Sequence, residues 1–132
     1  MSAPLAVLVV DDNEAGQFLV QSVLELQGFV VNIAGSSPEV HDRVRARRPD
    51  LILMDVQLPG QDGLALTREL KADPATALIP IVALTAHALA GQKEAAFAAG
   101  CVGYITKPID TRKLGSQIRE ILSAPPAMPV RR

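Results

Sequence analysis

Five short apolar runs, separated by stretches of helical length, constrain the fold of this chain more than any other feature of its sequence. Each run is rich in valine, isoleucine or leucine and is bounded by glycine, proline or acidic residues, as strands buried on both faces usually are. The runs occupy residues 5–10, 29–33, 51–54, 79–84 and 102–105. Because each run is too short for a buried helix, the sequence predicts five strands.

Capping residues predict a helix after each strand. Gly28 suits the end of the first helix, and Ser36 and Glu39 supply an N-cap and a capping-box acid for the second. The predicted helices cover residues 13–27, 36–48, 64–71 and 88–99, with a fifth capped by Asp110.

This alternation of strands and helices predicts one doubly wound α/β domain with a parallel sheet. We expect a flavodoxin-like (βα)5 fold with strand order 2-1-3-4-5. The domain is placed at residues 1–123, and the proline-rich segment 124–132 is expected to be a disordered tail.

The charges of the chain are nearly balanced, with 13 basic and 14 acidic side chains and a formal net charge of −1. This balance removes the broad positive field that nucleic-acid binding usually needs. No apolar run is long enough to cross a bilayer, and the one before Asp11 is too short for a secretory signal. We therefore expect a cytoplasmic protein with no nucleic-acid or membrane partner, whose single cysteine, Cys101, fills buried space.

Polar side chains follow four of the five predicted strands. They are Asp11 and Asp12 after the first strand, Asp55 after the third, Thr85 after the fourth and Lys107 after the fifth. In an open α/β sheet the ligand site lies off the carboxyl ends of the strands, where the strand order reverses. In the order 2-1-3-4-5 the four strands that end in these polar side chains are neighbours. The second strand, which carries no such side chain, lies at the edge.

Three carboxylates in one crevice repel each other by roughly 4 kcal/mol per pair at about 4 Å and an effective dielectric constant of about 20. A cation is therefore needed, and oxygen-only ligation with open positions suits Mg²⁺. Lys107 adds a positive charge and Thr85 a hydroxyl. Such a site is equipped to accept a phosphoryl group, with Asp55 as the nucleophile.

Four motifs of the chain resemble those of the receiver domain of two-component response regulators. They are VVDD at residues 9–12, LILMDVQLPG at 51–60, IVALTA at 81–86 and YITKP at 104–108. The resemblance covers residues 5–123. The sequence around Asp55 and Lys107 is similar to that of DivK-like regulators and of receivers in hybrid histidine kinases. The resemblance implies a bacterial, stand-alone signalling domain that is not an enzyme and assists only its own phosphorylation and dephosphorylation.

The resemblance also implies roles for individual residues. Asp55 would accept the phosphoryl group from a histidine kinase or a histidine phosphotransferase. Asp12 and Asp55 would bind Mg²⁺ directly, together with the backbone carbonyl of Gln57, while Asp11 would act through a metal-bound water.

The remaining implied roles concern the switch. Lys107 would bridge to Asp55 or its phosphate, Thr85 would donate its hydroxyl to the phosphate, and Tyr104 would then turn inward. The Lys107–Pro108 peptide bond would be cis. A partner protein would recognise the face formed by the fourth helix, the fifth strand and the fifth helix, and the chain would be a monomer or a phosphorylation-dependent dimer. The alternative for Tyr104 is ordinary packing.

Three interpretations stay open on the sequence alone. Gln57 and His87, each two residues past a site residue, either tune the lifetime of the phosphate or are solvated loop residues. Phe18 either docks the phosphodonor or packs beneath the fifth helix. The basic cluster of Arg43, Arg45, Arg47 and Arg48 is either solvated, as the helix dipole favours, or binds anions.

Two other functions compete with the receiver interpretation. An aspartate-nucleophile hydrolase of the phosphatase type typically needs a second acid two residues after the nucleophile, where this chain has Gln57. An interaction module that works without phosphorylation would not need Asp55, Thr85 and Lys107 together.

Overall fold

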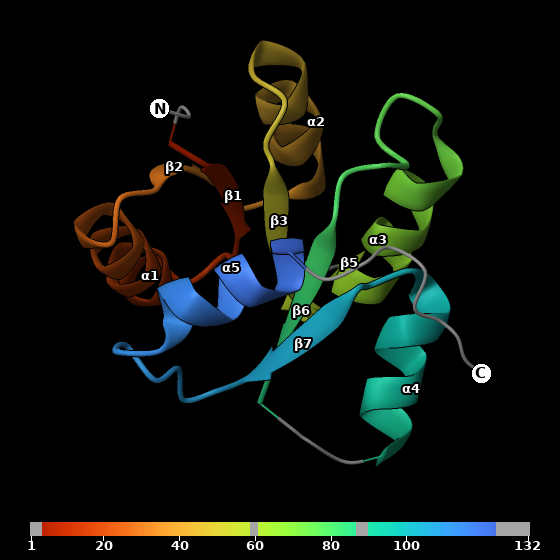
Figure 1. Cartoon of the computed structure of the whole chain (residues 1–132). Coiled ribbons are helices and arrows are strands. Elements are labelled where there is room, and N and C mark those ends of the chain that lie inside the picture. Colours follow the sequence, from red (N-terminus) through yellow and green to blue (C-terminus); the bar gives the residue numbers. More distant parts are fainter. Residues whose placement is uncertain (1–3, 59–60, 87–89, 124–132) are drawn as a thin grey trace.

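Five parallel strands form the central sheet of the computed structural model, which describes residues 4–58, 61–86 and 90–123 (Figure 1). The strand order is β2-β1-β3-β6-β7, which confirms the order 2-1-3-4-5 when only these five strands are counted. Their bounds are β1 Ala6–Val10, β2 Val30–Ala34, β3 Leu51–Asp55, β6 Ile81–Thr85 and β7 Gly103–Thr106.

Helices cover both faces of the sheet (Figure 1). They are α1 Glu14–Leu26, α2 Ser37–Ala46, α3 Gly63–Ala72, α4 Ala90–Ala99 and α5 Leu114–Ser123. Leu24 of α1 and Ile118 of α5 share one buried cluster, whereas Val40 of α2, Leu66 of α3 and Ala96 of α4 belong to a second. Because β1, β3 and β6 are buried throughout, the two clusters form the two halves of one doubly wound core.

Local hydrogen bonds set where the helices begin. The Asn13 side chain accepts from the Gly16 N–H at 2.9 Å, and Asp62 accepts from the Leu64 N–H at 2.9 Å. The predicted start of the fifth helix is wrong by one turn. The Asp110 side chain accepts from the Arg112 N–H at 3.0 Å and so closes a separate turn before α5 begins at Leu114.

A small hairpin between β3 and α3 was not predicted. It pairs β4, Gln57–Leu58, with β5, Gln61–Asp62, in antiparallel register. Segments this short carry no periodicity from which to predict a strand. In the part of the chain that the structure describes, none of the helices is long and apolar enough to span a bilayer.

Candidate functional site

The ends of β1 and β3 bring three carboxylates together. Asp11 and Asp12 follow β1, and Asp55 is the last residue of β3. One carboxylate oxygen from each lies within 4.8 Å of the others. Asp11 and Asp55 are only 3% and 5% exposed, whereas Asp12 is exposed. The cluster therefore has two buried acids and one open to solvent, with an all-oxygen donor set of the kind that Mg²⁺ prefers.

The first turn of α1 holds Asp11 in place. The Asn13 N–H donates to Asp11 Oδ1 at 2.9 Å, and the Gln17 side-chain amide donates to the Asp11 carbonyl. Burial raises the pKa of the Asp11 carboxyl, and the neighbouring Asp55 adds to this rise, while the Asn13 N–H and the Lys107 ammonium oppose it. In the absence of a further cation, the ionised form of Asp11 is disfavoured.

Asp55 is held at both carboxylate oxygens. The Gln57 N–H donates to Oδ1 at 3.0 Å, and Lys107 Nζ donates to Oδ2 at 3.3 Å. Lys107 Nζ also lies 4.0 Å from Asp11 Oδ2. One ammonium thus faces three carboxylates, so the cluster keeps an excess of negative charge that a divalent cation would balance.

Two glycines, which the sequence analysis missed, make room for the acids. A Cβ atom on Gly63 would lie 2.1 Å from the Asp55 carbonyl oxygen, and one on Gly16 would lie 2.8 Å from Asp11 Oδ2. The first contact is with backbone and cannot be relieved by turning a side chain. The one sequence signal was a poor helix former, glycine, in the first turn of both α1 and α3.

Thr85 and Lys107 lie on adjacent strand ends. The Lys107 N–H donates to the Thr85 carbonyl oxygen at 2.8 Å, which continues the pairing of β6 with β7. Thr85 is only 7% exposed, and Lys107 is partly buried. The Lys107–Pro108 peptide bond is cis, as the resemblance implies. The structure therefore brings the predicted hydroxyl and ammonium to the same edge of the sheet as the acids.

Tyr104 connects β7 to α4. Its half-buried ring meets Phe97 edge-on, with centroids 6.2 Å apart and an interplanar angle of 86°. Lys93 Nζ lies 5.1 Å from the centroid of the same ring. Tyr104 is thus packed against α4, on the face predicted to change on phosphorylation.

The other sequence-predicted residues lie outside the acidic cluster. Phe18 is 72% exposed, so the prediction that it packs beneath the fifth helix is wrong. Leu19, next to Phe18, is 45% exposed, and Leu26 at the far end of α1 is 89% exposed. Gln57 is exposed, and His87 lies outside the described residues.

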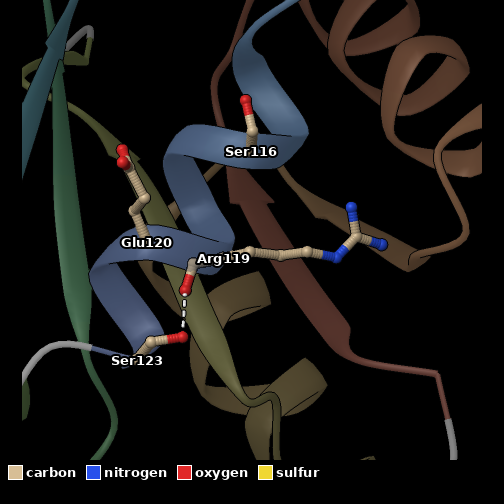
Figure 2. A pocket seen from close by; sticks show the side chains of 4 residues that line it. All are labelled: Ser116, Arg119, Glu120 and Ser123. Carbon is tan, nitrogen blue, oxygen red and sulfur yellow. Dashed lines mark hydrogen bonds between the residues drawn. The ribbon is translucent and has the colours of Figure 1, made fainter.

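A hollow of about 460 Å³ lies along α5 (Figure 2) and shares no residue with the acidic cluster. It is lined by Ser116, Arg119, Glu120 and Ser123. The Arg119 side chain extends away from Glu120 (Figure 2). It donates to the Gln27 carbonyl oxygen at 2.7 Å. Since all four lining residues come from one helix and do not converge, this groove has the character of a helix surface and adds nothing to the acidic cluster.

A five-stranded parallel sheet with acids at the carboxyl ends of β1 and β3 and a lysine after β7 defines the class of CheY-like receiver folds. The chain belongs to the response regulator receiver domain family, whose model matches residues 7–119. It is 39% identical to the polar-differentiation response regulator DivK of Brucella anthropi over 119 residues, which is 90% of this chain and 97% of that protein.

Two solved structures show the same fold. One is the receiver domain of a sensor histidine kinase from Pseudomonas aeruginosa, which is 32% identical and has a TM-score of 0.82, covering 92% of this chain and 100% of that one. That structure has a magnesium ion coordinated in its active site cleft. The other is the chemotaxis response regulator CheY4 of Vibrio cholerae, 24% identical with a TM-score of 0.84, covering 90% and 99% of the two chains. At that identity, CheY4 supports the fold alone.

Proposed function

We propose that this receiver domain accepts a phosphoryl group on Asp55 from a phosphohistidine of a histidine kinase or phosphotransferase. The observation that carries the proposal is the approach of Lys107 Nζ to Asp55 Oδ2, at 3.3 Å, beside the Asp11 and Asp12 carboxylates. An Asp55 oxygen forms the new bond to phosphorus while the P–N bond of the donor breaks. The electron pair of that bond returns to the donor's imidazole nitrogen, so the products are an aspartyl phosphate and a free histidine.

The donor set supports Mg²⁺ as the cofactor. Asp12, Asp55 and the backbone carbonyl of Gln57 would hold the ion, with Asp11 acting through a bound water. When bound, Mg²⁺ supplies positive charge to the oxygens of the transferring phosphoryl group. The magnesium ion in the Pseudomonas receiver supports this assignment.

The residues around Asp55 then form new hydrogen bonds with the phosphate. Lys107 pairs with a phosphate oxygen, and the Thr85 hydroxyl donates to another. Movement of Thr85 would allow Tyr104 to leave its position against Phe97 and turn inward. This would repack the surface formed by α4, β7 and α5, which is the surface we propose for a downstream protein partner.

The exposed apolar surface around Phe18 of α1 is the proposed binding surface for the phosphodonor protein. Phe18 is 72% exposed and lies on the helix whose first turn holds Asp11. Phe18→Ala should slow transfer from a phosphorylated histidine phosphotransferase about tenfold, because exposed aromatic anchors carry much of the energy of an interface. Phosphorylation by acetyl phosphate should be unchanged.

A matched variant tests this docking role. Leu26→Ala removes a side chain that is 89% exposed at the far end of the same helix. Equal slowing by both variants, or normal transfer to Phe18→Ala, would contradict docking at Phe18.

Gln57 and His87 are proposed to set the lifetime of the phosphate. Gln57 is exposed two residues past Asp55, and His87 occupies the same offset from Thr85 in the sequence. Each could govern how water approaches the acyl phosphate. Decay of the phosphorylated protein, followed in Gln57→Ala and His87→Ala, should change in at least one variant. Unchanged lifetimes in both would remove this role.

The central experiment is incubation with Mg²⁺ and acetyl phosphate, followed by mass spectrometry. An adduct of about 80 Da located at Asp55 is expected, and Asp55→Asn, which has the same shape but no nucleophile, should stay unmodified. Steady hydrolysis of acetyl phosphate with no adduct would point to a hydrolase. Neither adduct nor turnover would indicate an interaction module that works without phosphorylation.

A further inference from the structure

A second site lies at the β2 edge of the sheet and shares no residue with the acidic cluster. It is a pocket of about 450 Å³. Its lining comes from α1, β2 and the end of α2 and comprises Gln21, Val31, Asn32, Ile33, Arg43, Ala46 and Arg47. A concave site of this size can hold several residues of a bound chain or a small ligand.

The floor of the pocket is the outer edge of β2. The Val30 N–H donates to the carbonyl of the residue before β1, and the Ala34 carbonyl accepts from the residue after β1, whereas the Ile33 carbonyl accepts from Arg43 Nε at 3.0 Å. Successive residues of a parallel strand bond to opposite sides. The N–H and carbonyl groups of Val31 and the N–H group of Ile33 therefore point into the pocket, where an added strand can bond to them, whereas the outward carbonyl of Ile33 is already bonded to Arg43.

The wall on the α2 side has two available guanidinium groups. Arg45 is paired with Asp42 at 3.3 Å, and Arg48 donates to a backbone carbonyl of the loop after α3. Arg43 uses only Nε in its bond to β2. In the part of the chain that the structure describes, the Arg47 guanidinium has no hydrogen-bond or ion-pair partner. The helix dipole favours basic residues here, but it does not explain why these two, four residues apart, line the open edge of the sheet.

The wall on the α1 side has the opposite character. Gln21 Nε2 donates to Glu25 at 3.3 Å, so a carboxylate lies beside this wall. A small polyanion filling the pocket would meet that carboxylate. A strand alternates its side chains between the two faces of the sheet, so its acidic residues can all face α2 while the others face α1.

We propose that the β2 edge binds an extended acidic segment of a partner protein. The segment adds to the sheet through the N–H and carbonyl groups of Val31 and the N–H group of Ile33, and its acidic side chains pair with Arg47 and with the Nη atoms of Arg43, whose Nε keeps its bond to Ile33. This interaction does not depend on the phosphorylation of Asp55.

The test uses a fluorescein-labelled eight-residue peptide that alternates aspartate and threonine, titrated against the whole chain and followed by fluorescence anisotropy. We expect binding of this peptide and none of a matched peptide alternating lysine and threonine. Arg47→Gln should weaken binding about tenfold, the effect of losing one charge-assisted hydrogen bond. Arg45→Gln is the matched control on the same helix and should bind as the wild type does. Equal weakening by both variants, or no binding to the wild type, would overturn the proposal.

A second measurement separates a strand from a small anion. Amide hydrogen exchange at Val31 and Ile33 should slow when the acidic peptide is bound, because their N–H groups become donors to it. Inorganic pyrophosphate is the competing probe. Displacement of the peptide by pyrophosphate without any slowing at these two amides would assign the pocket to small anions and would overturn the proposal.

Discussion

Lys107 Nζ lies 3.3 Å from Asp55 Oδ2, although the two residues are 52 positions apart in the sequence. In the absence of a metal the ammonium is the positive charge nearest to this carboxylate among the described residues, and it lies 4.0 Å from Asp11 as well. The ammonium therefore neutralises part of the negative charge that would otherwise attract a divalent cation.

Replacement of this ammonium should strengthen metal binding. Lys107→Met removes the charge and leaves an unbranched side chain only one atom shorter, so Mg²⁺ should bind roughly three- to tenfold more tightly. Calorimetric titration without a phosphodonor measures this, with Lys113→Met, which removes an exposed lysine, as the control. Affinity that is unchanged or weaker in Lys107→Met would show that Lys107 does not compete with the metal.

Asp11 should make the metal-free protein less stable as the pH rises. Because burial raises its pKa above the ordinary 3.8, the folded chain holds this proton more tightly than the unfolded chain. Its contribution to stability is therefore complete below about pH 3.8 and is lost as the pH rises through the raised pKa.

At pH 7 without metal, Asp11→Asn should accordingly gain on the order of 1 kcal/mol in the free energy of unfolding. Mg²⁺ should raise the melting temperature of the wild type by mass action and that of Asp11→Asn much less. Thermal denaturation with and without Mg²⁺ checks both statements. A metal-free Asp11→Asn protein that is less stable than the wild type would contradict the first.

Gly63 should tolerate no side chain. The Cβ of an alanine would lie 2.1 Å from the Asp55 carbonyl oxygen, so β3 or α3 must move, at a cost of about 1–3 kcal/mol. Gly91 in α4 is the matched control, since no atom lies within 4 Å of the corresponding Cβ position. Gly91→Ala should stabilise the protein by about 1 kcal/mol through helix propensity. Urea denaturation of both variants would contradict this account if they shifted in the same direction.

Cys101 should be unreactive in the folded protein. Burial raises the pKa of its thiol to about 11, while Thr67 and Lys71 act in the opposite direction. A thiol reagent at pH 8 should label Cys101 only after unfolding in urea. Fast labelling of the native protein would show that the segment between α4 and β7 opens.

The same shift has a consequence for stability at high pH. Since the folded pKa lies above the unfolded value of 9.0, the stabilisation from Cys101 is present below pH 9 and is lost between about pH 9 and 11. The wild type should therefore lose more stability across this range than Cys101→Ala. Parallel loss in both proteins would contradict the shift.

The sequence predicted the order of the elements better than their ends. The sequence pattern places Asp55 and Thr85 just after their strands. In the structure each is the last residue of its strand and is still paired with a neighbouring strand, Asp55 with Leu84 and Thr85 with Thr106. Backbone hydrogen bonds between strands do not depend on the polarity of the side chains. A polar residue at a strand end therefore marks the edge of the core and can itself still be paired.

The acids, the hydroxyl and the lysine of the site could be found from sequence because their chemistry lies in their side chains. Gly16 and Gly63 could not, since each contributes the absence of a side chain at a contact between distant segments. The position of Phe18 also needed the fold. Both of its interpretations fitted the helical pattern, and only the packing of α1 shows which side of the helix faces the solvent.

Strand β2 differs from the other four strands of the sheet in carrying none of the acids, the hydroxyl or the lysine at its carboxyl end, where Ala34 and Gly35 lie. Substitutions on its outer edge can thus accumulate without disturbing the chemistry at Asp55. Among duplicated copies of such a chain, this edge can evolve to bind new partner proteins while the phosphate chemistry stays the same.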